Sequence, residues 1–262
     1  MKNKRQRLIL AVVFASLAIA ITAEMDSLGL STYSALPLFP LFGLFWILAK
    51  FSPAEIGFSW ARGRDYALAV LYPVVVITVA AVISVAAGAA NMSGTNWQKA
   101  GLNFGILTIS TVLVAIVTEE GFFRGSLWGV LRRAGLSETS VLIWSSLAFA
   151  AWHISFVTLA KDGALPPLQA TVFIVNAAVI GLVWGLIRSI SGSVIVSSVS
   201  HGVWNGAAYV LFGVGSVVRH GALGVTATAI FGVEVGAVGL VLNVLFAAWL
   251  WWRWLAIKTR TA

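Results

Sequence analysis

The stretch NFGILTISTVLVAIVTEEGFFRG, residues 103–125, holds a long apolar run that ends in two adjacent carboxylates, Glu119 and Glu120. A run of this length can cross the hydrocarbon of a bilayer as a helix. A charged side chain at membrane depth costs at least about 2.5 kcal/mol on the most lenient insertion scale, so intramembrane carboxylates need a functional reason. The stretch therefore predicts a membrane helix that carries a functional site.

The composition of the whole chain indicates a polytopic membrane protein. Of the 262 residues, 60% are hydrophobic and only 10% are charged, with a mean hydropathy of +0.95. There is no cysteine, which excludes disulfides, thiolate metal sites and cysteine nucleophiles. The net charge of +8 does not indicate nucleic acid as a partner, because the cations stand between apolar runs and not on one soluble face.

The apolar runs predict an all-α fold, a polytopic bundle of about eight transmembrane helices in a single membrane domain, residues 1–262. The connections are short, and no soluble domain interrupts the runs. The lipid bilayer is thus the first expected partner. The predicted spans are 8–23, 35–50, 66–90, 103–123, 140–160, 168–187, 193–212 and 230–252.

The distribution of cations predicts the orientation of these spans. Fourteen of the 17 Lys and Arg residues fall in alternate connections and at both ends, against Lys99, Lys161 and Arg219 in the other connections. Cytoplasmic loops are enriched in cations, so both termini are expected in the cytoplasm. The small size and the lack of a eukaryote-type sorting signal favour the plasma membrane of a prokaryote.

The first apolar run has a second interpretation. Basic residues precede it and small residues stand near Ala23, as in a cleaved signal peptide. We expect a retained span, because the apolar run is at the long end for a signal peptide.

Three further polar residues fall inside predicted spans: His153 in the fifth, and His201 with Asn205 in the seventh. His201 and Asn205 are four residues apart and share a helix face, as Glu120 and Arg124 do. Counting 1.5 Å per residue from the predicted helix ends allows these groups to meet the two carboxylates at one depth. Carboxylates, imidazoles and an amide at one dry site favour hydrolytic chemistry.

These residues resemble the motifs of a known family of intramembrane proteases, the CPBP family. Glu119-Glu120-Gly121-Phe122-Phe123-Arg124 is similar to its EExxxR motif, Phe149–His153 to FxxxH and His201–Asn205 to HxxxN. The family contains the CAAX prenyl endopeptidases (type 2-like) and bacteriocin-processing or immunity proteins. The motif-bearing core covers residues of about 103–210.

The resemblance implies an endopeptidase whose substrate is a peptide or protein, in some members a prenylated one. Glu119 would be the general base for a water that His153 holds. His201 and Asn205 would stabilise the oxyanion. Glu120, Arg124 and Phe149 would support the site.

The sequence leaves the cofactor open. Glu119, His153 and His201 could ligate zinc with an open fourth position. The HExxH helix is absent, however, and the prenyl endopeptidases favour a glutamate-activated water without metal, which we expect here.

Other interpretations of the same residues remain. The two carboxylates would form a structural ion pair with Arg124, or act as a relay in a proton- or cation-coupled transporter. A non-catalytic immunity-type protein is the third alternative. We expect the interface to solvate Glu234 near the outer end of the last span, and Asn176 and Asn243 to serve helix packing.

Overall fold

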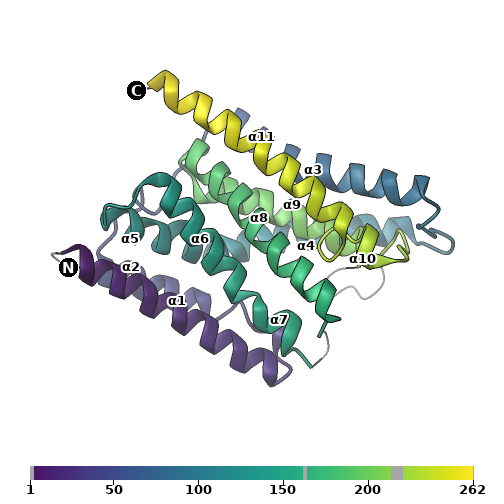
Figure 1. Ribbon diagram of the computed structural model, residues 1–262, viewed down its shortest axis with the longest axis horizontal. Helices are drawn as coiled ribbons and strands as arrows, with labels where there is room; N and C mark the ends of the chain where they lie inside the picture. Colours follow the sequence, from purple (N-terminus) through teal and green to yellow (C-terminus); the bar gives the residue numbers. More distant parts are fainter. Residues whose placement is uncertain (1–2, 162–163, 214–220, 262) are drawn as a thin grey trace.

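The computed structural model describes residues 3–161, 164–213 and 221–261, and these residues form helices and no strand. The helices lie side by side, with α1 (Lys4–Ser27) and α11 (Ala237–Thr261) on opposite edges of the view (Figure 1). The start of α1 and the end of α11 lie toward the same end of the bundle. The predicted all-α polytopic fold is confirmed, whereas Lys2 and Arg219 of the charge count lie outside the described residues.

The other helices follow the predicted spans closely. They are η1 (a 3-10 turn, Ser31–Tyr33), α2 (Leu38–Ala49), α3 (Gly63–Ala86), α4 (Trp97–Ala115), the π-helix η2 (Glu120–Leu127), α5 (Trp128–Arg133), α6 (Glu138–Trp152), α7 (Ile154–Thr158), α8 (Pro167–Ser191), α9 (Val194–Phe212) and α10 (Thr228–Phe231).

Seven helical segments of the described chain are long and apolar enough to cross a membrane. They are Lys4–Ser27, Ser31–Ala49, Gly63–Ala86, Trp97–Arg133, Glu138–Thr158, Pro167–Ser191 and Ala237–Thr259. The seventh predicted span, α9, has 19 residues but is not among them, because its Ser, His and Asn side chains lower its hydropathy.

α9 tolerates these polar side chains because other helices surround it. It packs against α4, α3 and α8, and a Cβ atom on Gly202 would overlap the side chain of Val112 in α4. Gly206 likewise stands where a Cβ would overlap the Thr108 side chain. The two glycines therefore allow close helix packing, and the contact holds α9 in the interior of the bundle.

The outward faces of the bundle are apolar, as a membrane protein requires. Ile109 and Leu113 of α4 are each 64% exposed. One hydrophobic core nevertheless runs from Ala11 in α1 to Trp254 in α11. Polar side chains such as Asn176, Asn243 and His201 are buried among the helices. Apolar groups outside and polar groups inside fit a lipid environment.

Two predicted spans differ from the structure where polar residues stand. The fifth is interrupted, since α6 ends at Trp152 and α7 begins at Ile154, which leaves His153 at the junction. The last was expected from residue 230, but α11 begins only at Ala237, after a turn that contains Glu234. Both irregularities place a polar side chain where a regular helix would not.

Candidate active site

The two adjacent carboxylates lie where α4 gives way to a π-helix. α4 ends at Ala115, and η2 carries residues 120–127 before α5 resumes the regular helix. Single π turns often mark functional sites, because the wider turn re-aims side chains. Gly121 is required here, since a Cβ on it would overlap the carbonyl oxygen of Ile116. The local geometry therefore separates the directions of Glu119 and Glu120.

Glu120 points into a closed environment with Arg124. Its Oε1 lies 3.2 Å from Arg124 Nη1, and both side chains are fully buried. Arg124 also donates to the carbonyl of Gly181 at 3.0 Å, and its guanidinium lies 4.3 Å from the centre of the Phe149 ring. The spacing of four residues was expected to bring Glu120 and Arg124 together, and it does.

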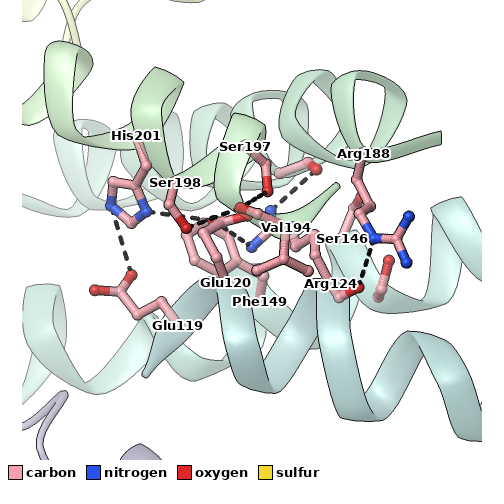
Figure 2. A network of polar contacts seen from close by, with 12 residues as sticks. Glu119, Glu120, Arg124, Ser146, Phe149, Arg188, Val194, Ser197, Ser198 and His201 are labelled. Carbon is pink, nitrogen blue, oxygen red and sulfur yellow. Dashed lines mark hydrogen bonds and ion pairs between the residues drawn. The ribbon is translucent and has the colours of Figure 1, made fainter. Parts of the chain in front are cut away.

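His201 lies between the two carboxylates, as Figure 2 shows. Its Nδ1 is 3.3 Å from Glu120 Oε1, and its Nε2 is 3.8 Å from Glu119 Oε2. The ring stacks on Trp184 with centroids 4.0 Å apart, which fixes its plane. One imidazole therefore connects the closed carboxylate to the more exposed one, whose side chain is 15% exposed.

His153 has its orientation fixed by the break between α6 and α7. Its Nδ1 lies 2.9 Å from the carbonyl oxygen of Phe149. A carbonyl only accepts hydrogen bonds, so Nδ1 must carry the proton, and in the neutral ring Nε2 keeps a free lone pair. The Phe149 ring packs against the imidazole with centroids 4.4 Å apart. Phe149 thus holds His153 with both its backbone and its ring.

These side chains meet at one cavity of about 210 Å³. Glu119, His153, His201 and Asn205 all line it, together with Phe149. Glu120 and Arg124 do not, since they lie behind its wall. The remaining lining comes from the later parts of α1, α6 and α9, the segment 31–35 and the earlier part of α8. The cavity therefore occupies the half of the bundle away from the termini.

Glu234 is a lining residue that the sequence did not lead us to expect. We expected the membrane–water interface to solvate Glu234. The residue is only 8% exposed, however, and it lines the same cavity. The indole Nε1 of Trp204 donates to Glu234 Oε1 at 2.7 Å. The interface prediction was wrong because the chain turns inward before α11 begins. An acidic residue inside an apolar run was the available signal.

The predicted zinc ligands, Glu119, His153 and His201, all line the cavity. Among the described residues, no group of three or more His, Cys, Asp or Glu side chains is placed to hold a metal ion. Glu119, His153 and His201 as arranged here do not fit a zinc site, so no chemical step is derived through a metal.

These features define a class of protein: a multi-pass helical membrane protein with carboxylate, imidazole and amide groups around an internal cavity. Residues 101–207 match the family model called Rce1-like, described as type II CAAX prenyl endopeptidase Rce1-like. This segment contains all three motifs, so the family resemblance is confirmed. No curated protein matches the chain significantly. At the level of the family, the match supports a CAAX-protease-like membrane peptidase.

Proposed function

We propose that this protein is an intramembrane endopeptidase in which Glu119 activates a water molecule to hydrolyse a peptide bond. The observation that carries the proposal is the shared cavity, which Glu119, His153 and Asn205 line together with His201. The match of residues 101–207 to a family of endopeptidases supports the same reaction class.

Each side chain has a role that its surroundings support. Glu119 takes a proton from the water as the water oxygen attacks the carbonyl carbon. His153 accepts a hydrogen bond from that water through Nε2, because its Nδ1 is already engaged. Asn205 donates to the oxyanion that forms on the carbonyl oxygen, and His201 donates through Nε2 as the imidazolium, whose Nδ1–H faces Glu120. When the carbon–nitrogen bond breaks, Glu119 returns the proton to the leaving amine.

The residues behind the wall position these groups without touching the substrate. Glu120 accepts from Arg124 and faces Nδ1 of His201, so it orients the imidazole. Arg124 is in turn held by Gly181 and by the ring of Phe149. A reacting group held by such contacts needs little rearrangement when charge develops.

The substrate is a peptide segment that reaches the cavity within the bilayer, and a prenylated carboxyl-terminal peptide is the first probe to use. The family description supports this choice. We propose that the reaction needs no metal and takes place in the plasma membrane of a prokaryote. Localisation in the native cell tests the second of these statements.

The test is cleavage of a labelled prenylated peptide and of its unprenylated form by the purified protein in detergent. The reaction is run with and without a chelator, beside Glu119→Ala and His153→Ala. We expect cleavage that the chelator leaves unchanged and that both variants abolish. Loss of cleavage with the chelator would overturn the metal-free mechanism, and full activity of both variants would overturn the assigned roles.

The alternatives make different predictions for the same variants. A coupled transporter would show flux in proteoliposomes that depends on Glu119 without any peptide cleavage. A non-catalytic immunity protein would keep its phenotype when Glu119 or His153 is replaced. Either result, with no cleavage of any peptide, would reject the endopeptidase.

A further inference from the structure

Glu234 is a buried carboxylate without a cationic partner. In the described part of the chain, no Lys, Arg or His side chain forms an ion pair with it, and its hydrogen bond comes from the neutral indole of Trp204. Glu120, in contrast, has Arg124 at 3.2 Å. A buried charge is normally paired, and one that is not requires a reason.

The backbone of the turn at Glu234 is held firmly in place. The side-chain amide of Asn176 in α8 donates to the carbonyl of Val233 at 3.1 Å and to that of Glu234 at 3.0 Å. Asn243 in α11 donates to Asn176 Oδ1 at 2.9 Å, and the hydroxyl of Tyr72 in α3 donates to Asn243 Oδ1 at 2.6 Å. Asn176 and Asn243 therefore fix the turn, beyond general helix packing.

These contacts close into a ring of side chains. The Tyr72 ring stacks on Trp204, with centroids 5.2 Å apart and planes 10° from parallel. Trp204 then donates to the carboxylate of Glu234, whose carbonyl accepts from Asn176. Helices α3, α8, α9 and α11 all contribute, so the position of Glu234 is determined from both sides. Such a fixed carboxylate on a cavity wall is preorganised for a ligand.

The distance from the reacting groups follows from helix geometry. Trp204, which holds Glu234, lies three residues from His201 and beside Asn205 on α9. One helical turn rises about 5.4 Å, and an extended peptide advances about 3.3–3.6 Å per residue. A substrate group that meets Glu234 is therefore within about two residues of the cleaved bond.

We propose that Glu234 is a specificity-determining residue that binds a cationic group, a Lys or Arg side chain, of the peptide substrate close to the cleaved bond. This inference rests on the proposed endopeptidase function. The second carboxylate oxygen accepts no hydrogen bond from the described residues and is available to the ligand. The aromatic rings of Trp204 and Tyr209, which also line the cavity, favour a cation there.

The experiment compares two labelled peptides that differ only by Lys or Gln at one position within two residues of the cleaved bond. kcat/KM is measured for the wild type, Glu234→Gln, Glu234→Asp and Glu138→Gln. Glu138 is the matched control, because its carboxylate pairs with Lys258 at the other end of the bundle. We expect the wild type to prefer the Lys peptide by about tenfold or more, chiefly through KM.

Glu234→Gln should bring the ratio of kcat/KM for the Lys peptide to that for the Gln peptide close to one. Glu234→Asp should keep part of this preference, and Glu138→Gln should leave it unchanged. A purely structural role would lower both rates equally and leave the ratio as it was. An unchanged ratio in Glu234→Gln, or a wild type without preference, would overturn the proposal.

Peptide binding separates this proposal from the proposed function. Both peptides are titrated by fluorescence polarisation into Glu119→Gln, which is expected not to cleave, with and without Glu234→Gln. Tighter binding of the Lys peptide that depends on Glu234 supports the cationic subsite, whether or not the wild type cleaves. If the Lys peptide binds equally well with and without Glu234→Gln, the cationic subsite is rejected. The endopeptidase function is then decided by the cleavage assay alone.

Discussion

Two neighbouring regions use the same kind of side chain in opposite ways. On the closed side, Glu120 is fully buried and paired with Arg124 at 3.2 Å. On the cavity side, Glu119 and Glu234 line an open space, and neither has a guanidinium or ammonium partner among the described residues. Paired carboxylates build structure, whereas unpaired ones at a cavity are available for chemistry or for a ligand.

The division falls where the π-helix η2 begins, directly after Glu119. Glu119 and Glu120 are adjacent in sequence, yet His201 meets one with Nε2 and the other with Nδ1. We therefore expect changes on the cavity side to lower turnover and changes on the closed side to lower the free energy of unfolding. Five measurements test this expectation.

The largest effect is expected for Glu119→Gln. Loss of a general base lowers the rate by about 10²- to 10⁴-fold, and the unfolding midpoint should stay close to that of the wild type because no cation loses its partner. Peptide cleavage and thermal unfolding in detergent measure the two effects. Glu24→Gln, on an exposed position of α1, is the control. More than a tenth of wild-type activity in Glu119→Gln would break the comparison.

The next effect is expected for Glu120→Gln. Removing one partner of a buried ion pair costs about 3–5 kcal/mol of stability, because the other charge stays buried alone. Denaturant unfolding should show this loss, and the added change Arg124→Met should recover part of it. If Glu120→Gln is as stable as Glu119→Gln, the closed side does not have the structural role assigned to it.

A smaller effect is expected where α9 meets α4. Gly202→Ala places a methyl group against Val112 and Thr108, and overpacking of this kind costs about 1–3 kcal/mol. Gly105→Ala in α4 is the matched control, since nothing lies within 4 Å of the added Cβ. Equal unfolding midpoints for the two variants would show that the glycine contact does not set the place of α9.

Glu55, in the loop between α2 and α3, forms an exposed ion pair that can be compared with the buried pair of Glu120 and Arg124. Glu55 accepts from Arg133 at 2.7 and 2.6 Å and is 41% exposed. The backbone N–H of Ser52, followed by Arg133, holds the pKa of Glu55 below its usual 4.5.

The stability from this pair is present above pH 4.5 and is lost as the pH falls through the lowered pKa. Exposed pairs are worth about 0.2–1 kcal/mol. Glu55→Gln should remove a pH dependence of that size from the unfolding midpoint measured between about pH 3 and 6. An effect as large as that of Glu120→Gln would contradict the distinction between exposed and buried pairs.

The last prediction concerns orientation and expects no change in activity. The chain has no cysteine, so a single introduced thiol reports on one position. With cytoplasmic termini, an impermeant maleimide should label Ser93→Cys in intact cells and Ala54→Cys only after permeabilisation. Both positions are exposed in the structure. The reverse pattern would show that the positive-inside prediction is wrong.

The sequence predicted the parts of the fold that depend on local pattern. Apolar runs located the helices, although the last one was predicted at 230–252 and lies at Ala237–Thr261, and the three motifs identified side chains that meet at one cavity. It missed what depends on partners distant in sequence. Glu234 is placed by Trp204, 30 residues earlier, and by Asn176, 58 residues earlier.

The apolar run around Glu234 predicts one continuous helix, because no Pro marks the turn before Ala237. The π-helix was also missed, because regular helix geometry is the default for such a run. The same default hid the break at His153. In each case, tertiary contacts decide the local backbone.

The residues that line the cavity lie in the half of the bundle opposite the start of α1 and the end of α11 (Figure 1). If that cationic end is cytoplasmic, Glu119 lies nearer the outer leaflet than the inner one. A peptide made in the cytosol would then have to cross part of the bilayer before it met Glu119.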